Sequence, residues 1–335
     1  MLVVERGEPG REASWAAAGM LVGQGGEIPG ALKPLAAESA RIYPEFVHEL
    51  RDESGLKIDF RDQGTIVISR EEDLPEGAEF LASEKLRALE PALNSVLKLA
   101  AYVPERSVDP RDLVAAAVRT AHHREVDISS GNEVKAVLAS ADRVVGVQTD
   151  KTTYSAEIVV NSAGAWAGRI APHNFPVRPV KGQMLAVVGG PALNHVLRGD
   201  RAYLVPRSDG RIVIGSTLED VGYDKNLDIN VVQGLFHSAV EVVPALANAK
   251  KHEDWAGLRP GTPDGLPILG ETSTRGYFIV GGHYRDGILL APVTAQVMTD
   301  VILRRNPAFN LAAFSPARFD ISVHHGDTET RRKVV

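Results

Sequence analysis

The sequence predicts a mixed α/β (α+β) fold in which a unit of parallel strands and helices is interleaved with an antiparallel, β-rich unit. Three observations predict it. The apolar, β-branched run at residues 1–4 stops at an acidic residue. Apolar strands at 156–161 and 276–281 each run into a small-residue turn and then a helix start. Short strands separated by tight turns follow one another at 133–161 and again at 178–215.

The elements of the first half follow from local patterns. Residues 32–53 have the apolar spacing of a helix, with a kink or interruption expected at Pro34 and Pro44 because proline removes a backbone donor. Asp109 is the expected N-cap of a second helix, at about 110–123. The remaining segments are expected to be a Gly-rich loop at 23–26, strands at 64–69 and 97–103, and a meander of strands at 133–138, 143–149 and 155–161.

The second half alternates strands and helices. Strands are expected at 178–188, 202–205, 211–215 and 276–281, with a hairpin turn at Ser208-Asp209-Gly210, helices at 230–246 and 288–303, and a frayed tail from about His324. Because segments of the two units alternate along the chain, two discontinuous domains are expected. Residues 1–50, 106–170 and 254–335 would form one, and residues 51–105 and 171–253 the other.

Composition excludes several classes of function. The 335 residues carry a net charge of −6 with scattered basic residues, so no nucleic-acid partner is expected. No apolar run approaches the roughly 18 residues of a membrane span. Glu5 and Arg6 rule out a secretory signal at this N-terminus, so we expect a cytoplasmic location without membrane association. The absence of cysteine excludes disulfides, iron–sulfur clusters, thiol catalysis and a Cys-linked cofactor.

Glu5 indicates a dinucleotide-binding, Rossmann-like sheet, in which an acidic residue at the end of the second strand holds the adenosine ribose. The first strand, its Gly-rich turn and the phosphate-binding helix would precede it by roughly thirty residues. We therefore expect the printed chain to lack this first βα unit and to bind the dinucleotide poorly. Two explanations stay open: an internally assigned start codon, which the presence of the later motifs favours, or a truncated and inactive chain.

Four sequence strings, in this order and spacing, carry a family resemblance. They are WAAAGM at 15–20, VVNSAGAWA at 159–167, AGLRPGTPDGLPILG at 256–270 and GHYRDGILLAP at 282–292. Together they resemble the FAD-dependent D-amino-acid oxidase superfamily, and within it the glycine oxidases of thiamine (thiazole) biosynthesis. The resemblance runs from residue 1 to about residue 305. It implies an FAD-binding domain joined to a substrate domain, and non-covalent FAD as the cofactor.

The resemblance implies roles for individual residues around the FAD. Glu5 would hold the adenosine ribose with Arg6 beside it, and Val134 would bind the adenine through its backbone. The further cofactor-binding residues that it implies are Ser14, Ala18, Gly19, Met20, Ala163, Gly164 and Trp166, followed by His283, Tyr284, Arg285, Asp286, Gly287, Ile288 and Leu289.

The resemblance also implies that Arg259 and Tyr203 clamp the substrate carboxylate and that Arg285 is a second basic group near the amino acid. Physical chemistry agrees, because a guanidinium can hold a carboxylate through two parallel charge-assisted bonds that fix its orientation. Orientation is what hydride transfer to a flavin requires, since the flavin supplies the redox chemistry. We expect no catalytic acid or base if the amine arrives neutral.

Structural alternatives stand beside these roles. Arg259 could pair with Asp254 or Asp264, Arg285 could form a surface pair with Asp286, and Tyr203 could be a core aromatic residue. We interpret Trp15 and Trp166 as packing residues, and the histidine pairs at 122–123 and 324–325 as solvated, so no metal site is expected.

The expected reaction is FAD-dependent oxidation of glycine or a similar small amino acid such as sarcosine or D-alanine. It would yield an imine and then a 2-oxo acid, ammonia and, with O2 as acceptor, hydrogen peroxide. A homo-oligomer, dimeric or tetrameric, is expected from the family. The alternatives are a D-amino-acid or 2-hydroxy-acid dehydrogenase of the same superfamily, or a cofactor-free remnant that binds amino acids.

Overall fold

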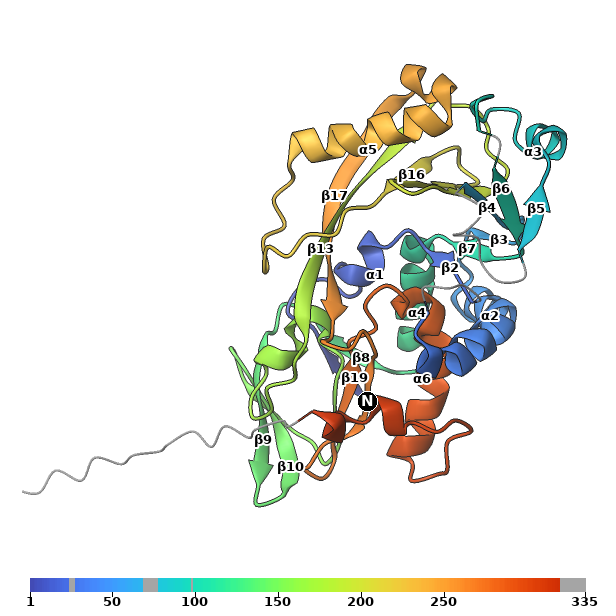
Figure 1. Ribbon diagram of the computed structural model, residues 1–335. Coiled ribbons are helices and arrows are strands. Elements are labelled where there is room, and N and C mark those ends of the chain that lie inside the picture. The colour runs from blue at the N-terminus through green and yellow to red at the C-terminus, as the bar shows by residue number, and fades with distance from the viewer. Residues whose placement is uncertain (24–27, 69–77, 98, 320–335) are drawn as a thin grey trace, which may run out of the picture.

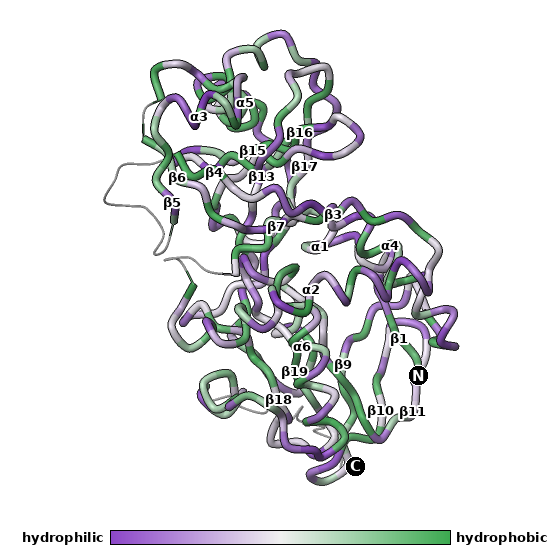
Figure 2. The backbone as a smooth tube through the Cα atoms, turned by 90° about the vertical axis from the view of Figure 1, so that its right-hand side faces the viewer, coloured by the Kyte–Doolittle hydropathy of each residue, from purple (hydrophilic) through white to green (hydrophobic). Residues whose placement is uncertain are grey.

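The computed structural model describes residues 1–23, 28–68, 78–97 and 99–319, which fold into two lobes (Figure 1). The upper lobe is a large sheet whose outer face is covered by α5 (Ile229–Val242), with α3 (Ser83–Leu89) at one end. The lower lobe contains the longest helices and several small sheets. Seen from the side, α1 (Ala13–Ala16) and β7 (Arg106–Val108) lie where the lobes meet (Figure 2). The predicted mixed α/β fold is confirmed.

The large sheet has eight strands, and all neighbouring strands are antiparallel except β14 and β4. In spatial order they are β17 (Lys250–Gly261), β13 (Arg178–Val188), β16 (Ile212–Gly215), β15 (Tyr203–Pro206), β14 (Val196–Arg198), β4 (Thr65–Ile68), β6 (Ala100–Val103) and β5 (Glu79–Leu81). The long strands β13 and β17 pair along their length and reach from the upper lobe toward the lower one (Figure 1).

Side-chain alternation gives this sheet two different faces. On β13, Leu185 and Val187 pack with α5 and α3 in one core, whereas Met184 and Ala186 pack on the opposite face against residues of α1. This is the period of two expected of a strand that is buried on both faces. The face that carries Met184 therefore points at the lower lobe.

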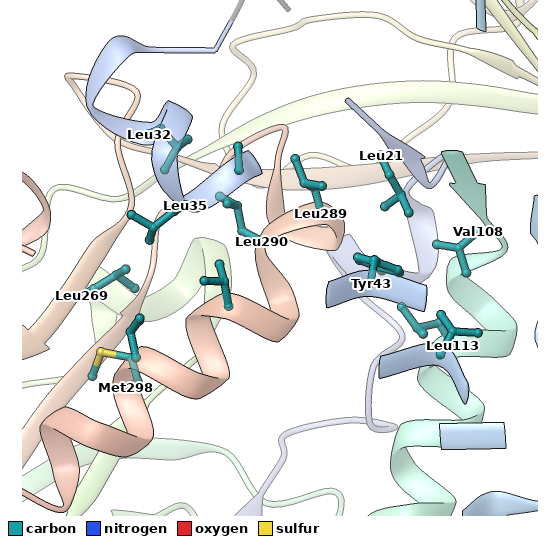
Figure 3. Packing of buried hydrophobic residues seen from close by; sticks show 14 of the residues in the cluster. Leu21, Leu32, Leu35, Tyr43, Val108, Leu113, Leu269, Leu289, Leu290 and Met298 are labelled. Carbon is teal, nitrogen blue, oxygen red and sulfur yellow. The ribbon is translucent and has the colours of Figure 1, made fainter. Parts of the chain in front are cut away.

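Three helices form the core of the lower lobe, α2 (Lys33–Ser54), α4 (Pro110–His123) and α6 (Gly287–Ile302). Leucines of α2 and α6 interdigitate, and Tyr43 lies between them and Leu113 of α4 (Figure 3). Asp109 caps α4 by accepting a hydrogen bond from the Arg111 amide, as predicted. Of the described helices, none is long and apolar enough to cross a membrane.

Small sheets complete the lower lobe. β1 (Leu2–Val4) pairs in parallel with β8 (Asp127–Ser129), and β12 (Val159–Asn161) pairs in parallel with β19 (Tyr277–Gly281), whose other neighbour is β18 (Ile268–Glu271). A meander joins β9 (Val134–Ser140), β10 (Arg143–Thr149) and β11 (Thr153–Ser155), and β7 lies between β2 (Met20–Leu21) and β3 (Phe60–Arg61). The short 3-10 helices are η1 (Gly30–Leu32), η3 (Gly164–Arg169), η4 (Pro244–Asn248), η5 (Ala312–Phe314) and η6 (Pro316–Arg318).

Three predictions about elements need correction, and one long strand was missed. The expected strand at 155–161 is two strands in two sheets, since β11 closes the meander and β12 pairs with β19. The expected interruption is absent, since the helix is continuous over 33–54. Pro34 lies in its first turn, where the missing donor has no helical partner, and Pro44 lies inside the helix. The helix expected at 230–246 ends at Val242 and a 3-10 turn follows. Strand β17 was not predicted at all.

Some predictions fall on residues outside the described part of the chain. These are most of the Gly-rich loop at 23–26, residues 69 and 98 at the edges of two predicted strands, and the tail from His324. The predicted domain boundaries stay a prediction.

Candidate functional site

The two residues expected to clamp the substrate lie on the same face of the large sheet. Tyr203 packs in the cluster on the face toward the lower lobe, together with Met184 and Trp255. Arg259 is four residues beyond Trp255 on β17, so it shares that face. The sheet order places β13 and β16 between their two strands. Sheet pairing thus brings together residues 56 positions apart in the sequence.

Arg259 is held by neutral oxygens. Its Nη2 donates to the Ser216 hydroxyl at 2.7 Å, and its Nη1 donates to the Thr217 carbonyl at 3.2 Å. Asp254 and Asp264, the alternative partners, instead bind Lys251 at 2.7 Å and Arg318 at 2.8 Å. Among the described residues no carboxylate forms an ion pair with this half-buried guanidinium, so its charge is available to an anion.

Two glycines make room for the clamp. A Cβ at Gly182 of β13 would lie 2.3 Å from Nη1 of Arg259, and a Cβ at Gly215 of β16 would lie 2.7 Å from the Tyr203 hydroxyl. Both clamp side chains therefore lie directly over bare main chain. Glycine inside a strand weakens that strand. It commonly marks a position where another group approaches the backbone closely, as the two clamp side chains do here.

The segment that presents Ser216 and Thr217 is itself anchored. The Gln183 amide donates to the Thr217 hydroxyl at 2.8 Å, and the Gln183 side chain donates to Glu219 at 2.9 Å. Lys181 lies 3.5 Å from the same carboxylate. Partial burial opposes ionisation of Glu219, but the Thr217 and Gln183 hydrogen bonds and the Lys181 charge outweigh it and hold its pKa below the usual range. Arg259 is thus supported by a charged, fully hydrogen-bonded layer.

The Tyr203 hydroxyl stays protonated at neutral pH. Burial raises its pKa, against the opposing effects of the Ser216 hydroxyl and of the positive charges on Arg259 and Arg285. Its hydroxyl lies 3.9 Å from the Met184 sulfur, which is a weak acceptor. A neutral phenol in this position is a hydrogen-bond donor for a carboxylate.

The segment 14–20 passes beneath this face of the sheet. Ser14 is exposed on α1, whereas Ala18 and Gly19 are buried and Met20 packs in the same cluster as Tyr203. Gly19 has a φ of +74°, and a Cβ there would lie 1.9 Å from the Val108 carbonyl. Only glycine fits this position.

Glu5 follows β1 directly, and its carboxylate accepts a hydrogen bond from the Gly7 amide at 2.9 Å. Arg6 pairs with Glu12 at 2.7 Å and stacks 3.6 Å above the Trp166 ring. Arg6 is therefore a specific packing partner of the Trp166 ring. Val134 begins β9, with its backbone in the meander.

Residues after β12 and β19 form the remaining parts of the site. Ala163 donates its amide to the Asn161 side chain at 3.1 Å, and Gly164, with a φ of +53°, faces open space where a Cβ would lie. Tyr284 also has a positive φ, +49°, which is unusual for a residue with a side chain and typical of functional turns. Its amide donates to the Pro260 carbonyl at 3.0 Å, which joins the turn to the strand of Arg259.

The rest of the segment 283–289 enters the helical core. Asp286 is the N-cap residue of α6, which begins at Gly287. The Ile288 and Leu289 carbonyls accept hydrogen bonds from Tyr43 and Ser39, and the Leu289 side chain is buried in the core (Figure 3). Arg285 and Asp286 both have interaction partners. The Arg285 guanidinium lies 5.5 Å from the Tyr284 ring.

The comparisons with known proteins identify the family. The model of the DAO family, described as FAD dependent oxidoreductase, matches residues 1–301. The chain belongs to the DAO family. A glycine oxidase of Geobacillus kaustophilus is 33% identical over 94% of this chain and 90% of its own length. The crystal structure of the glycine oxidase from that organism superposes with a TM-score of 0.89, covering 95% of this chain and 92% of that one.

A second relative is longer than this chain. The bifunctional protein ThiO/ThiG of Synechocystis sp. is 36% identical over 92% of this chain. The matched region covers 48% of the length of that protein, so this chain spans about half of it. An iminodiacetate oxidase from Chelativorans sp. is 24% identical and has a TM-score of 0.85, so it shares the fold. The predicted family and the dependence on FAD are confirmed by these comparisons.

The described residues of this DAO-family chain fit a flavin. Glu5, Gly164 and the turn after Gly281 all lie at carboxyl ends of parallel strands, where open α/β sheets bind ligands. A Cβ at Gly164 would face open space, so bare main chain is accessible there, whereas Gly19 is required by its close contact with the Val108 carbonyl. The described residues contain no group of three or more metal-ligating side chains. The individual roles of the predicted FAD residues stay predictions.

Sequence reasoning missed the residues that support Arg259. Ser216 and Thr217 bind the guanidinium, and Gly182 and Gly215 leave space for the clamp. The sequence gives no signal for the two glycines, since Gly182 lies between Lys181 and Gln183 and Gly215 is the last residue of its strand. None existed for the hydroxyl residues, whose role depends on pairing between distant strands.

Proposed function

We propose that this chain oxidises glycine or a similarly small amino acid, such as sarcosine or D-alanine. One observation carries the proposal: the half-buried Arg259 guanidinium has no carboxylate partner among the described residues and lies in one neighbourhood with a protonated tyrosine. This donor set matches an amino-acid carboxylate. The glycine oxidases among the relatives support the same substrate class.

The chain's own residues bind and orient the substrate. Arg259 takes the carboxylate, Tyr203 donates to it, and Arg285 adds positive charge to the same neighbourhood. The residues proposed to hold FAD include Glu5, Ala18–Met20, Ala163–Gly164 and 283–287. When bound, FAD supplies the acceptor for the hydride that leaves the substrate Cα. The amine loses a proton, and water hydrolyses the imine to a 2-oxo acid and ammonia, or to a 2-oxo acid and methylamine where sarcosine is the substrate.

O2 is the proposed electron acceptor and hydrogen peroxide the final reduced product. The bifunctional ThiO/ThiG relative supports a place in the thiamine-thiazole pathway, which the family resemblance also implies. A cytoplasmic location and a homo-oligomeric state belong to the same proposal.

The experiment that tests this proposal is anaerobic reduction of the flavin. The chain is mixed with excess FAD and titrated with glycine, sarcosine, D-alanine and the hydroxy acid glycolate, and the visible flavin band is followed. We expect the amino acids to bleach the flavin band and glycolate to leave the band unchanged. Arg259→Met should raise the glycine concentration needed by about tenfold or more, the value of a lost charged hydrogen bond. Arg178→Met, an exposed arginine on the neighbouring strand, is the matched control.

Two results would overturn the proposal. One is a bound flavin that no amino acid reduces. The other is an Arg259→Met variant as responsive to glycine as the control.

A further inference from the structure

The main chain expected to face the flavin is held from the opposite lobe. The Ala18 carbonyl accepts a hydrogen bond from Nη2 of Arg207 at 2.7 Å, and the Ala16 carbonyl accepts one from Nε1 of Trp255 at 3.1 Å. Arg207 is 5% exposed and Trp255 7%. Both donors belong to the large sheet, whereas both acceptors belong to the segment 14–20. The two lobes are therefore joined directly at the proposed cofactor segment.

Arg207 shares its strand with part of the substrate clamp. It follows β15 directly, and the alternation Tyr203, Val205, Arg207 puts all three on the face toward the lower lobe. A fixed spacing of four residues thus links the group expected to bind the carboxylate to the group that holds Ala18.

The Arg207 contacts converge on Gly19. Nη1 of Arg207 donates at 3.2 Å to the Val108 carbonyl, the same oxygen that leaves no room for a Cβ at Gly19. The Val108 amide donates to the Gly19 carbonyl at 2.9 Å. Residues 18 and 19 are consequently bound on both sides, by β15 through Arg207 and by β7 through its backbone.

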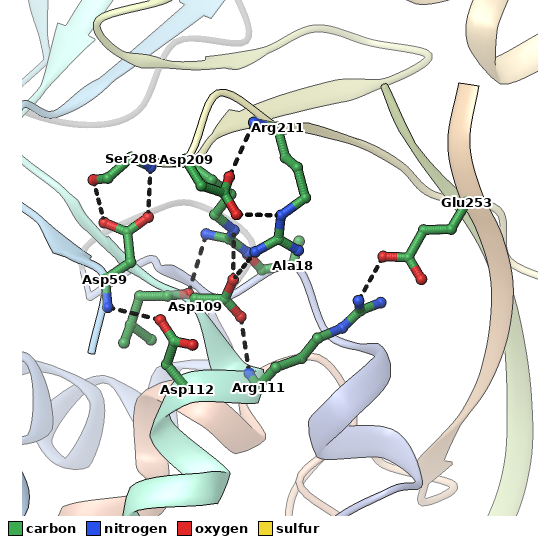
Figure 4. Close-up of polar contacts among 11 residues, drawn as sticks. Ala18, Asp59, Asp109, Arg111, Asp112, Ser208, Asp209, Arg211 and Glu253 are labelled. Atoms are coloured by element: carbon green, nitrogen blue, oxygen red, sulfur yellow. Dashed lines mark hydrogen bonds and ion pairs between the residues drawn. The ribbon is translucent and has the colours of Figure 1, made fainter. Parts of the chain in front are cut away.

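Burial of the Arg207 guanidinium costs solvation free energy, and nearby charged groups offset part of this cost. Asp109 lies 3.5 Å from Nε of Arg207 and also binds Arg211 at 2.9 Å. Figure 4 shows Asp109 between Arg211 and the start of α4, with Ala18 close by. Nε of Arg207 has no hydrogen-bond partner among the described residues, so its ion pair with Asp109 is a long one. Both Nη groups, by contrast, donate hydrogen bonds to carbonyls. The guanidinium is positioned for these carbonyls more than for the carboxylate.

We propose that Arg207 is a positioning residue, which holds the Ala18–Met20 main chain in register with Tyr203 so that flavin and substrate are presented to each other. The expected effect of Arg207 on flavin reduction rests on the proposed function. Its role in holding the Ala18–Met20 main chain rests on geometry alone. Arg207 is not among the residues expected to bind the substrate or FAD. It acts through the Ala18 and Val108 carbonyls.

Hydrogen exchange of the segment 14–22 tests the positioning part in the purified chain without added FAD. Arg207→Met should speed exchange of this segment by about tenfold, the loss expected when a charged hydrogen bond is removed. Trp255→Phe, which removes the neighbouring bond to Ala16, should act in the same direction. Arg211→Met is the matched control, because Arg211 pairs with Asp109 from the same turn without binding residues 14–20.

Flavin reduction tests the catalytic part. With FAD bound, Arg207→Met should slow reduction by glycine about tenfold while the KM for glycine changes less than twofold, because Arg259 and Tyr203 are untouched. Arg207→Lys keeps the charge and one donor, and should recover part of both losses. If Arg207→Met does not fold, Arg207→Lys and Trp255→Phe provide the same comparison.

Equal exchange of residues 14–22 in Arg207→Met and Arg211→Met would overturn the proposal, as would an Arg207 variant that changes only the KM. If glycine fails to reduce the flavin of the unmodified chain, the proposed function fails, whereas the exchange result still decides the positioning role.

Discussion

The proposed substrate site depends on single residues that were predictable to different degrees. Arg259 and Tyr203 could be singled out from their motifs, and the structure brings them to one face of one sheet. The alternative ion pairs of Arg259 do not form, because Asp254 and Asp264 have partners of their own. Ser216, Thr217 and Gly182 could not be predicted as its supports, since their contacts exist only once β13, β16 and β17 pair.

Gly182→Ala is the residue-scale prediction. The new Cβ would lie 2.3 Å from the Arg259 guanidinium, and the far end of a flexible side chain can move away, so the fold should persist. We expect the KM for glycine to rise about tenfold, because a displaced guanidinium loses a charged hydrogen bond to the carboxylate. Steady-state kinetics with glycine measures it.

Gly30→Ala is the control for this variant, because nothing lies within 4 Å of the Cβ that it adds. A KM for Gly182→Ala equal to that of Gly30→Ala would show that Arg259 does not bind the substrate in the conformation described.

At the scale of elements, strong periodicity predicted the helices, and context decided the strands. The capped helix α4 and the long helices α2 and α6 were predictable from apolar spacing. β17 was not, because it begins with the charged run Lys250–Asp254 at the edge of the sheet and ends in a Pro-Gly pair. Edge strands commonly carry charge, and that removes the alternation by which a strand is detected. β11 and β12 were merged because short strands give no signal of the sheet they join.

Helix α5 supplies a prediction about stability. Gly234 is exposed in its middle, and a Cβ there would meet nothing within 4 Å. Gly234→Ala should raise the free energy of unfolding by about 0.5–1 kcal/mol, because alanine loses less backbone entropy in a helix. Urea unfolding measures this change. Reduction of the flavin by free glycine should stay the same, since α5 covers the face of the sheet away from Tyr203. A lower free energy of unfolding for the variant would contradict the described helix.

At the scale of the whole molecule, the two lobes are joined by polar side-chain contacts as well as by the long strands. Asp59 accepts hydrogen bonds from Ser208 at 2.6 and 2.8 Å, and Arg111 pairs with Glu253 at 2.5 Å (Figure 4). Arg111 also stacks 3.6 Å above the Trp15 ring. The Asp59–Ser208 and Arg111–Glu253 contacts connect residues more than 140 positions apart. A sequence indicates charge and polarity, but it does not show which distant groups will meet in a closed interior.

Burial also makes the stability of the molecule depend on pH. It lowers the pKa of His283 to about 4, and it lowers the pKa of His173 as well. Between pH 6.5 and 4 the unfolded chain therefore binds more protons than the folded chain, so stability falls as the pH is lowered through this window. For His283 alone the full loss is about 3 kcal/mol.

His283→Asn removes this proton linkage. We expect the variant to lose less stability than the unmodified chain between pH 7 and pH 5, although it gives up the hydrogen bond to Thr294 and starts from a lower value. Urea unfolding at the two pH values measures the difference, and the exposed His48→Asn is the control. Equal pH dependence in His283→Asn and His48→Asn would mean that His283 is solvated and can protonate in the folded chain, so the turn before α6 would be open to water where the flavin is expected to bind.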